Sequence, residues 1–323
     1  MQVLVNAGRL VLATLGLALA GAVHAQAFPT RPVTLIVPYA VGGITDVAFR
    51  ALAVEMGKNL GQTIVVDNKV GGGGKIGARA IFAAAKDGYT IGVLNSGLGT
   101  NSALTDPGFA VQPGRDYAPL SRVLETYIVL ITSPTGPFKD VKALVDFAKT
   151  NPGKVNLASS GLGTSGHLAI ELLKILTGIN VVHVPYKGEN LATNDVIGGQ
   201  VQGAFVSAVI KPLVTSGKLA GLAVTSSARW SAFPDLPTLR ESVAERFDVT
   251  AWQGLIGPAG MPPEVVSRLN RAIVTALQQP GLRKIMEDLG LVVGTSSPEE
   301  FAAFIRKDND FWRPVFAQGI KME

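Results

Sequence analysis

The stretch SSGLGTSGH, residues 159 to 167, brings glycines, hydroxyl groups and a histidine together at spacings that several chemistries use. Gly161, Gly163 and Gly166 form a G-x-G-x-x-G series, which holds a dinucleotide when it follows a strand and opens a helix. Ser165 lies in a sequence close to that of a hydrolase nucleophile elbow. A Gly-rich loop can also bind another anion through its backbone N–H groups.

A dinucleotide site needs an acidic residue after the next strand, where it binds the ribose. Residues 181–184 predict that strand, and Pro185, Tyr186 and Lys187 follow it without an acid. A dinucleotide-binding oxidoreductase therefore stays only as an alternative. A second glycine run, residues 71–75, does not make a phosphate loop, because no Ser or Thr follows its lysine.

An exported serine hydrolase using Ser165 is the other alternative. His167 stands where the elbow has its last glycine, and such enzymes place an acid and then a histidine well downstream. His183 is the one histidine beyond His167. Two histidines, scattered carboxylates and no cysteine also make no metal cluster, so we predict neither a metal nor a cofactor.

Three loops remain that suit a small anion. Ser-Gly-Leu-Gly-Thr occurs twice, at residues 96–100 and 160–164, and Gly42 to Asp46 forms the third loop. Each follows a predicted strand, where open α/β sheets bind ligands. A helix N-terminus there offers unpaired N–H groups and about half a positive charge, enough for a carboxylate. The alternative is an ordinary turn in which Thr164 or Ser165 simply caps a helix.

The elements that must position these loops alternate along the chain. This alternation predicts mostly parallel sheets covered by helices on both faces. A first group is followed from about residue 125 by a second with the same rhythm, and a tail holds a strand around Trp252 and helices opening at residues 261 and 297. The expected strands are 33–37, 63–67, 89–94, 127–132, 155–158, 181–184, 203–206 and 219–225, and the expected helices include 45–60, 141–149, 168–176 and 192–197.

The first residues predict export. Arg9, the apolar run 10–22 and the small residues of Val23-His24-Ala25 are typical of a signal peptide, residues 1–25, removed on the way to the periplasm. Charged residues make up only 16% of the chain, and basic residues form no run interleaved with aromatics. We therefore expect no nucleic-acid partner.

Several stretches resemble one family throughout the mature chain. They are "FPTRPVTLIVPYAVGGITD" from residue 28, "VVDNKVGGGGKIGARA", "DGYTIGV", "ASSGLGTSGHLAIELLK", "HVPYKGENLATNDVIGGQVQ", "LAVTSSARW", "PDLPTLRE" and "GLIGPAGMP". They are similar to the Bug family, the extracytoplasmic solute-binding proteins of tripartite tricarboxylate transporters. Val41, Lys75 and Lys86 depart from the family's usual residues and leave the ligand's identity open.

The resemblance implies a monomeric binding protein, not an enzyme, with a two-lobed α/β fold of the type II, Venus-flytrap class and crossing hinge strands. Lobe 1 would comprise residues 26–125 and 227–323, and lobe 2 residues 126–226. A small organic carboxylate or dicarboxylate would lie between the lobes, held by N–H groups, hydroxyls and water. Its delivery to membrane transporter subunits or to a sensor would follow.

By position, the resemblance also implies the ligand-binding residues. Asp46 would organise its loop or hold a water, because it cannot attract a carboxylate. His167 would be a neutral donor, since a helix N-terminus disfavours the imidazolium. Tyr186 and Lys187 could equally form a surface turn. The full set is Tyr39, Gly42, Gly43, Thr45, Asp46, Asn95, Ser96, Gly97, Ser160, Gly161, Thr164, Ser165, His167, Tyr186 and Ser207.

Overall fold

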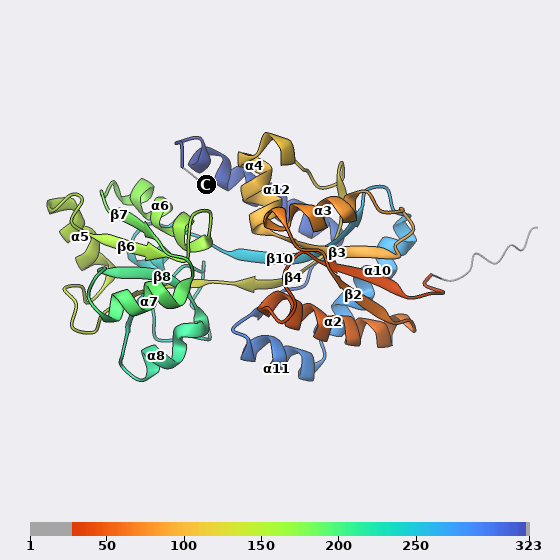
Figure 1. The fold of residues 1–323 in the computed structure, drawn as a ribbon, viewed down its shortest axis with the longest axis horizontal. Helices are drawn as coiled ribbons and strands as arrows, with labels where there is room; N and C mark the ends of the chain where they lie inside the picture. Colours follow the sequence, from red (N-terminus) through yellow and green to blue (C-terminus); the bar gives the residue numbers. More distant parts are fainter. Residues whose placement is uncertain (1–27, 321–323) are drawn as a thin grey trace, which may run out of the picture.

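The computed structural model describes residues 28–320, which form two α/β lobes side by side (Figure 1). The predicted signal peptide lies outside these described residues. Each lobe is built on one mixed sheet with helices on its faces. The two-lobed α/β fold class is therefore confirmed, but the sheets are mixed and not mostly parallel as predicted, because β10 and β5 each run antiparallel to both of their neighbours. None of the helices in residues 28–320 combines the length and apolar character needed to cross a membrane.

The first lobe contains a six-stranded sheet in the order β11-β4-β10-β3-β1-β2. Strand β1 is parallel to both of its neighbours, β2 and β3, whereas β10 runs antiparallel to β3 and β4. The strands are β1 (Val33–Val37), β2 (Ile64–Asn68), β3 (Thr90–Asn95), β4 (Tyr117–Thr126), β10 (Ala251–Pro258) and β11 (Val292–Val293). The helices are α2 (Ile44–Leu60), α3 (Lys75–Phe82), α4 (Ala103–Thr105), α10 (Pro263–Leu277) and α11 (Pro280–Asp288), with a π-helical turn η2 (Gly97–Ser102).

The second lobe contains a five-stranded sheet in the order β7-β6-β8-β5-β9. Strand β6 is parallel to both of its neighbours, and β5 is antiparallel to both of its own. The strands are β5 (Ile128–Thr132), β6 (Asn156–Ser159), β7 (Val182–Pro185), β8 (Gly203–Ser207) and β9 (Ala220–Val224). The helices are α5 (Val141–Thr150), α6 (Ser165–Thr177), α7 (Glu189–Ile197), α8 (Lys211–Thr215) and α9 (Leu239–Ser242).

Strand β1 shows why the first sheet sits at the centre of its lobe. Val33, Leu35 and Val37 pack in one cluster with α2 and α10, whereas Ile36 packs on the other face with residues of α3. All four side chains are buried, as expected for a parallel strand covered on both faces. Because β1 cannot shift without exposing one set, the loop that follows it has a fixed starting point.

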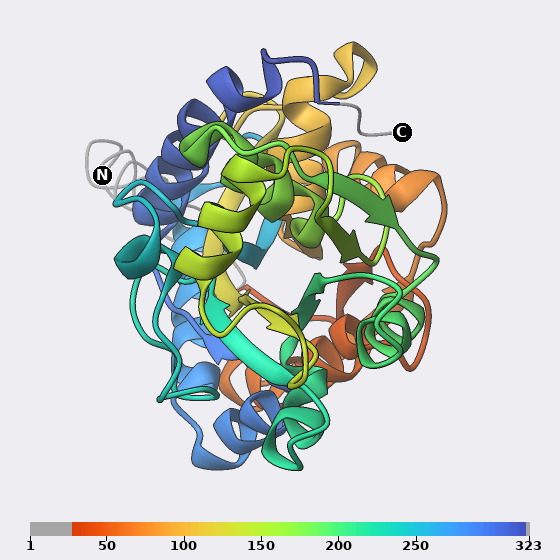
Figure 2. The ribbon, with the colours of Figure 1, turned by 90° about the vertical axis from the view of Figure 1, so that its left-hand side faces the viewer.

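Three connections join the lobes. Strand β4 passes into β5 through Tyr127 alone, and the chain returns from β9 to β10 over residues 225–250 (Figure 1). Helix α12 (Pro298–Phe316) is the third connection, because Phe301 packs in the first lobe and Trp312 in the second. Viewed from the end of the second lobe, this helix runs along the outside of both sheets (Figure 2).

Residues 227–250 pack against the second sheet. Trp230 and Phe233 lie in one of its clusters, and Phe247 and Val249 lie in another. We propose to place the return to the first lobe at Ala251, where β10 begins, rather than at residue 227.

The predicted capping residues of α12 are present. Ser297 accepts a hydrogen bond from the N–H of Glu300, whose carboxylate accepts one from the N–H of Ser297, and Pro298 occupies the first helical position. Helix α11 was not predicted, because its nine residues begin at Pro280 only three residues after α10 ends.

Candidate functional site

The loop between β1 and α2 presents an uncapped helix N-terminus. Gly42 has a φ of +80°, and Gly43 stands at the N-cap position without any side-chain cap. The N–H groups of the first helical turn have no partner within a helix. Thr45 adds a hydroxyl that makes no hydrogen bond within residues 28–320. In Figure 1 the start of α2 lies on the side facing the second lobe.

Asp46 holds this loop together. Its carboxylate accepts hydrogen bonds from the N–H of Gly42 at 2.9 Å, from Arg50 Nε at 2.9 Å and from Asn68 Nδ2 at 2.8 Å. The hydrogen bond from Arg50 does most to lower the pKa of Asp46, to about 2. The residue is 1% exposed. These contacts favour the predicted role in organising the loop over a contact with the ligand.

Tyr39 and Asn95 are joined in the same lobe. The Asn95 amide donates to the Tyr39 hydroxyl, and its oxygen accepts the N–H of Leu98 at 3.1 Å. Burial raises the pKa of Tyr39 to about 12, so the phenol keeps its proton and can donate it. Ser96 and Gly97 follow at the start of η2, and the Ser96 hydroxyl has no hydrogen-bond partner in the described part of the chain.

The second-lobe loop, defined here as residues 160–165, leads from β6 into α6. Gly161 has a φ of +139° and Gly163 a φ of +71°, a region that favours glycine. Thr164 is the N-cap, because its hydroxyl accepts the N–H of His167 and donates to the carbonyl of Gly161 at 2.8 Å. The hydroxyls of Ser160 and Ser165 make no hydrogen bond within residues 28–320. Strand β6 ends on the side facing the first lobe (Figure 1).

His167 is neutral, but mainly for a reason other than the predicted helix dipole. Burial lowers the pKa of His167 and also that of His183, which falls to about 4. Nδ1 of His167 accepts the N–H of Gly163 at 3.0 Å, and His183 Nε2 lies 2.7 Å from the Ser159 hydroxyl. His167 therefore supports the second-lobe loop from inside the lobe.

His167, Glu171 and His183 bring candidate metal-ligand atoms within 4.8 Å of one another, a cluster that the sequence did not predict. The two imidazole rings stack with centroids 4.3 Å apart and planes 11° apart. Lone pairs of parallel rings lie in separate planes and do not converge on one ion, and Nδ1 of His167 already accepts a hydrogen bond. The geometry does not fit a metal ion.

The two remaining predicted residues are engaged within the second lobe. The Tyr186 hydroxyl donates to Asp195 at 2.5 Å, which raises the pKa of the tyrosine to about 12. Ser207 donates to Glu189 from its hydroxyl at 2.6 Å and from its N–H at 3.0 Å. Neither hydroxyl proton is available to a ligand without breaking one of these bonds.

A cavity of about 1280 Å³ lies between the lobes. None of the predicted residues lines it, although Ile44 of the first lobe follows Gly43 and Ala208 of the second follows Ser207. Its walls come mainly from α8, α11 and β11. They carry two basic and two acidic residues, Lys211, Arg283, Glu287 and Asp288, beside several apolar side chains. These residues carry no signal in the sequence, because they do not lie in Gly-rich loops that follow strands.

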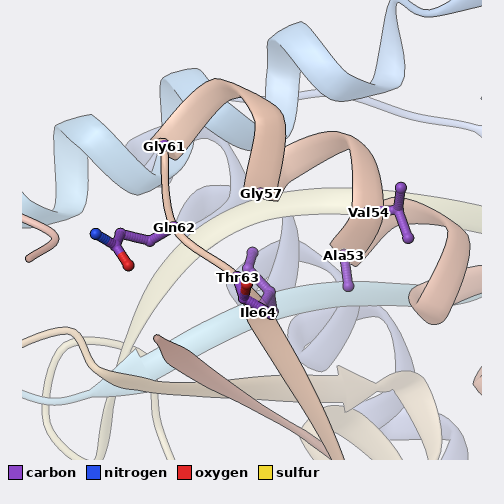
Figure 3. Close-up of a pocket in the computed structure, with 7 residues that line it drawn as sticks. All are labelled: Ala53, Val54, Gly57, Gly61, Gln62, Thr63 and Ile64. Atoms are coloured by element: carbon purple, nitrogen blue, oxygen red, sulfur yellow. The ribbon is translucent and has the colours of Figure 1, made fainter. Parts of the chain in front are cut away.

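A second depression, of about 380 Å³, lies at the far end of α2 (Figure 3). Ala53, Val54 and Gly57 of the helix form it together with residues 61–64. It belongs to the first lobe alone and lies at the opposite end of α2 from Gly43. It contains no charged side chain, so we assign it no function.

Comparison with known proteins now decides the family. The model of the tripartite tricarboxylate transporter family receptor, TctC, matches residues 48–319. The chain belongs to this family. It is 34% identical to the protein BugT of Bordetella pertussis, over 97% of this chain and 96% of that one. A protein from the tcbD-tcbE intergenic region of Pseudomonas sp. is also 34% identical, over 98% and 96% of the two chains.

Solved TctC structures share the fold. A TctC solute-binding protein from Polaromonas without ligand superposes with a TM-score of 0.81, at 29% identity, over 90% of this chain and 99% of that one. MatC from Rhodopseudomonas palustris with bound malate gives 0.71 at 32% identity, over 89% and 99%. Rpa4515 of the same organism with adipate gives 0.73 at 30% identity, over 90% and 97%.

Membership of the TctC family confirms the resemblance seen in the sequence and distinguishes a binding protein from an enzyme. TctC proteins are solute-binding receptors, so this chain is a binding protein and not an enzyme. The hydrolase and oxidoreductase alternatives are set aside. Related structures are described as periplasmic, among them the periplasmic binding protein BugD, 33% identical over 92% of this chain.

Proposed function

We propose that this TctC receptor captures a small organic carboxylate between its lobes. One observation carries the proposal. Each lobe turns a loop with free N–H groups and hydroxyls, at the start of α2 and of α6, towards the other lobe. Such groups bind an anion without an arginine or lysine, because the helix N-terminus supplies partial positive charge.

The residues have different parts in this proposal. Thr45, Ser160 and Ser165 would donate hydroxyl protons, and Tyr39 its phenol proton, to the ligand. Asp46 and His167 would keep the two loops in shape. The same pocket would include Gly42, Gly43, Asn95, Ser96, Gly97, Gly161 and Thr164, with Tyr186 and Ser207 beneath the second-lobe loop.

We propose dicarboxylates as the ligand class. Two of the related structures hold malate and adipate, which are small dicarboxylates of different length.

The receptor would work as an exported monomer. Residues 1–25 would direct it to the periplasm, where it would pass its ligand to membrane transporter subunits or to a sensor. The low proportion of charged residues gives no support for a nucleic-acid partner.

A thermal-shift panel on the mature protein tests the proposal. It would compare mono-, di- and tricarboxylates with amino acids, NADH and simple esters. A ligand at 100 times its Kd stabilises a protein by about 2.7 kcal/mol. For lobes of this size we expect Tm to rise by roughly 5–10 °C. A response confined to carboxylates supports the proposal, and a response to amino acids, NADH or esters alone contradicts it.

A further inference from the structure

The two copies of Ser-Gly-Leu-Gly-Thr meet across the lobes. The first copy continues into η2, and the second forms most of the second-lobe loop. Asn101 follows the first copy directly, and its Nδ2 donates a hydrogen bond to the carbonyl oxygen of Gly163 in the second copy, at 3.4 Å. A side chain of the first lobe thus contacts the backbone of the second lobe's candidate ligand loop.

Asn101 is linked to α12 through the residue that precedes it. The hydroxyl of the neighbouring Thr100 donates to Asp308 Oδ2 at 2.5 Å, and Trp252 Nε1 donates to the same oxygen at 2.8 Å. Thr100 and Trp252 are fully buried. One carboxylate oxygen on α12 therefore joins η2 to β10, the strand that re-enters the first lobe.

The close packing at this junction depends on a glycine of the first copy. A Cβ atom at Gly99 would lie 2.6 Å from the ring of Trp252, far inside contact distance. Helix α12 continues from Asp308 to Trp312 and Val315, which pack in the second-lobe core. The junction therefore lies where the helix passes from one lobe to the other.

Gly163 is held on both sides. Its N–H donates to His167 within the second lobe, while its carbonyl accepts from Asn101 of the first. The first contact shapes the loop, and the second sets where the loop lies relative to the first lobe. The second bond, at 3.4 Å, is the hydrogen bond that ties this loop directly to a side chain of the first lobe.

We propose that Asn101 and Asp308 are positioning residues. They hold the second-lobe loop in a fixed orientation relative to the first lobe, so that both lobes can contact the same ligand. The predicted effect of these residues on ligand affinity rests on the proposed function. Their predicted effect on the arrangement of the lobes does not, so an experiment can contradict either prediction without the other.

The first test measures lobe arrangement without any ligand. The chain contains no cysteine, so the substitutions Lys58→Cys and Lys149→Cys place one spin label on an exposed helix position of each lobe. Asn101→Ala should broaden or shift the distribution of distances between the labels, measured by pulsed electron resonance. An unchanged distribution overturns the proposal.

Asn59→Ala is the matched control. Asn59 also donates its amide to a backbone carbonyl at 3.4 Å, that of Ala272, but both groups lie in the first lobe. Its loss should leave the distances between the lobes unchanged. A similar shift in both variants would mean that general destabilisation moves the lobes, and would also overturn the proposal.

Asp308 is tested by a graded pair of substitutions. Asp308→Asn keeps an oxygen that accepts from Thr100 and Trp252, whereas Asp308→Ala removes it. We expect the alanine variant to reproduce the altered distances and to shift tryptophan emission, and the asparagine variant to stay near the wild type. If Asp308→Ala does not fold, Thr100→Val removes one of the two bonds at nearly constant volume. Wild-type distances in the folded variant contradict the role of Asp308.

Affinity supplies the last measurement, with malate and adipate as probes. Losing one hydrogen bond of this kind should raise Kd about fivefold in Asn101→Ala. An unchanged Kd would overturn the link to binding. If the wild type binds neither probe, the proposed ligand class fails, while the label distances still decide the role of Asn101.

Discussion

At the scale of single residues, two buried polar groups predicted at the site make hydrogen bonds within their own loops. Asp46 and His167 each accept a hydrogen bond from a backbone N–H of the loop, and Asp46 also accepts from Arg50 and Asn68. Buried charges and acceptors are costly unless paired, so such residues stabilise one loop geometry strongly. The groups left for a ligand are hydroxyls and N–H groups.

Asp46 gives a pH prediction. Its pKa is lowered to about 2 in the folded protein, against 3.8 ordinarily, first through Arg50. The folded state therefore gains stability above pH 4, about 2 kcal/mol, which is lost as the pH falls towards 2. Asp46→Asn should lower Tm at pH 7 and flatten its decline below pH 4, as measured by calorimetry. The exposed Asp146→Asn serves as the control, and equal effects in both variants would contradict the assignment.

The stacked histidines predict a second pH dependence. Burial lowers the pKa of both histidines, that of His183 to about 4. As the pH falls below 6.5, the unfolded chain therefore binds protons at these residues while the folded chain does not. Stability is fully present above about pH 6.5 and declines as the pH falls towards 4. His183→Asn should reduce the decline of Tm between pH 6.5 and 4.5. Identical slopes in the variant and the wild type would refute this.

At the scale of elements, the helix starts decide where an anion can bind. The sequence predicted the start of α2 to within one residue, and it predicted a Gly-rich loop between β6 and α6. It placed the start of α6 at residue 168, three residues after Ser165, where the helix begins. It did not predict that the first Ser-Gly-Leu-Gly-Thr becomes a π-helical turn with its threonine buried. The two copies of these five residues adopt different conformations because, in the first copy, Thr100 donates a hydrogen bond to Asp308 and Gly99 packs against Trp252. Both partners are distant along the chain.

The second-lobe loop can be tested at this scale. Gly161→Ala should weaken carboxylate binding, because a φ of +139° is strained for alanine and its Cβ would lie 3.3 Å from the Tyr186 carbonyl oxygen. Far-UV circular dichroism should stay unchanged. Gly153→Ala is the control, since Gly153 also has a positive φ, +73°, but lies in a turn outside the site. Titration calorimetry should give a raised Kd in the first variant only, and equal values would argue against the loop.

At the scale of the whole molecule, we propose that the lobes approach each other when a ligand is captured. Ile44 of the first lobe and Val209 of the second line the same cavity and are 44% and 61% exposed. Closure would bury apolar surface, worth roughly 25 cal/mol per Å². The apolar edges therefore favour the closed form once a ligand bridges the loops.

Closure gives the last prediction. Val209→Asp should raise Kd for a carboxylate roughly tenfold, because closing would bring the new charge into an apolar contact. Val54→Asp is the matched control, since Val54 is 60% exposed but lies away from the cavity, in α2. Small-angle scattering should record less compaction on ligand addition in the first variant. Full compaction with wild-type affinity would rule out this contact.

The sequence by itself determined the family and the alternation of strands and helices, because hydrophobic period, glycines and capping residues act over a few neighbours. It also predicted the loops at which we propose that an anion binds. Only the tertiary structure decided which polar groups remain free. Tyr186 and Ser207 are occupied by Asp195 and Glu189, and residues 227–250 pack with the second sheet. The contact of Asn101 with Gly163 likewise joins residues 62 positions apart. Such pairings depend on how neighbouring elements and lobes pack together, which no local sequence pattern encodes.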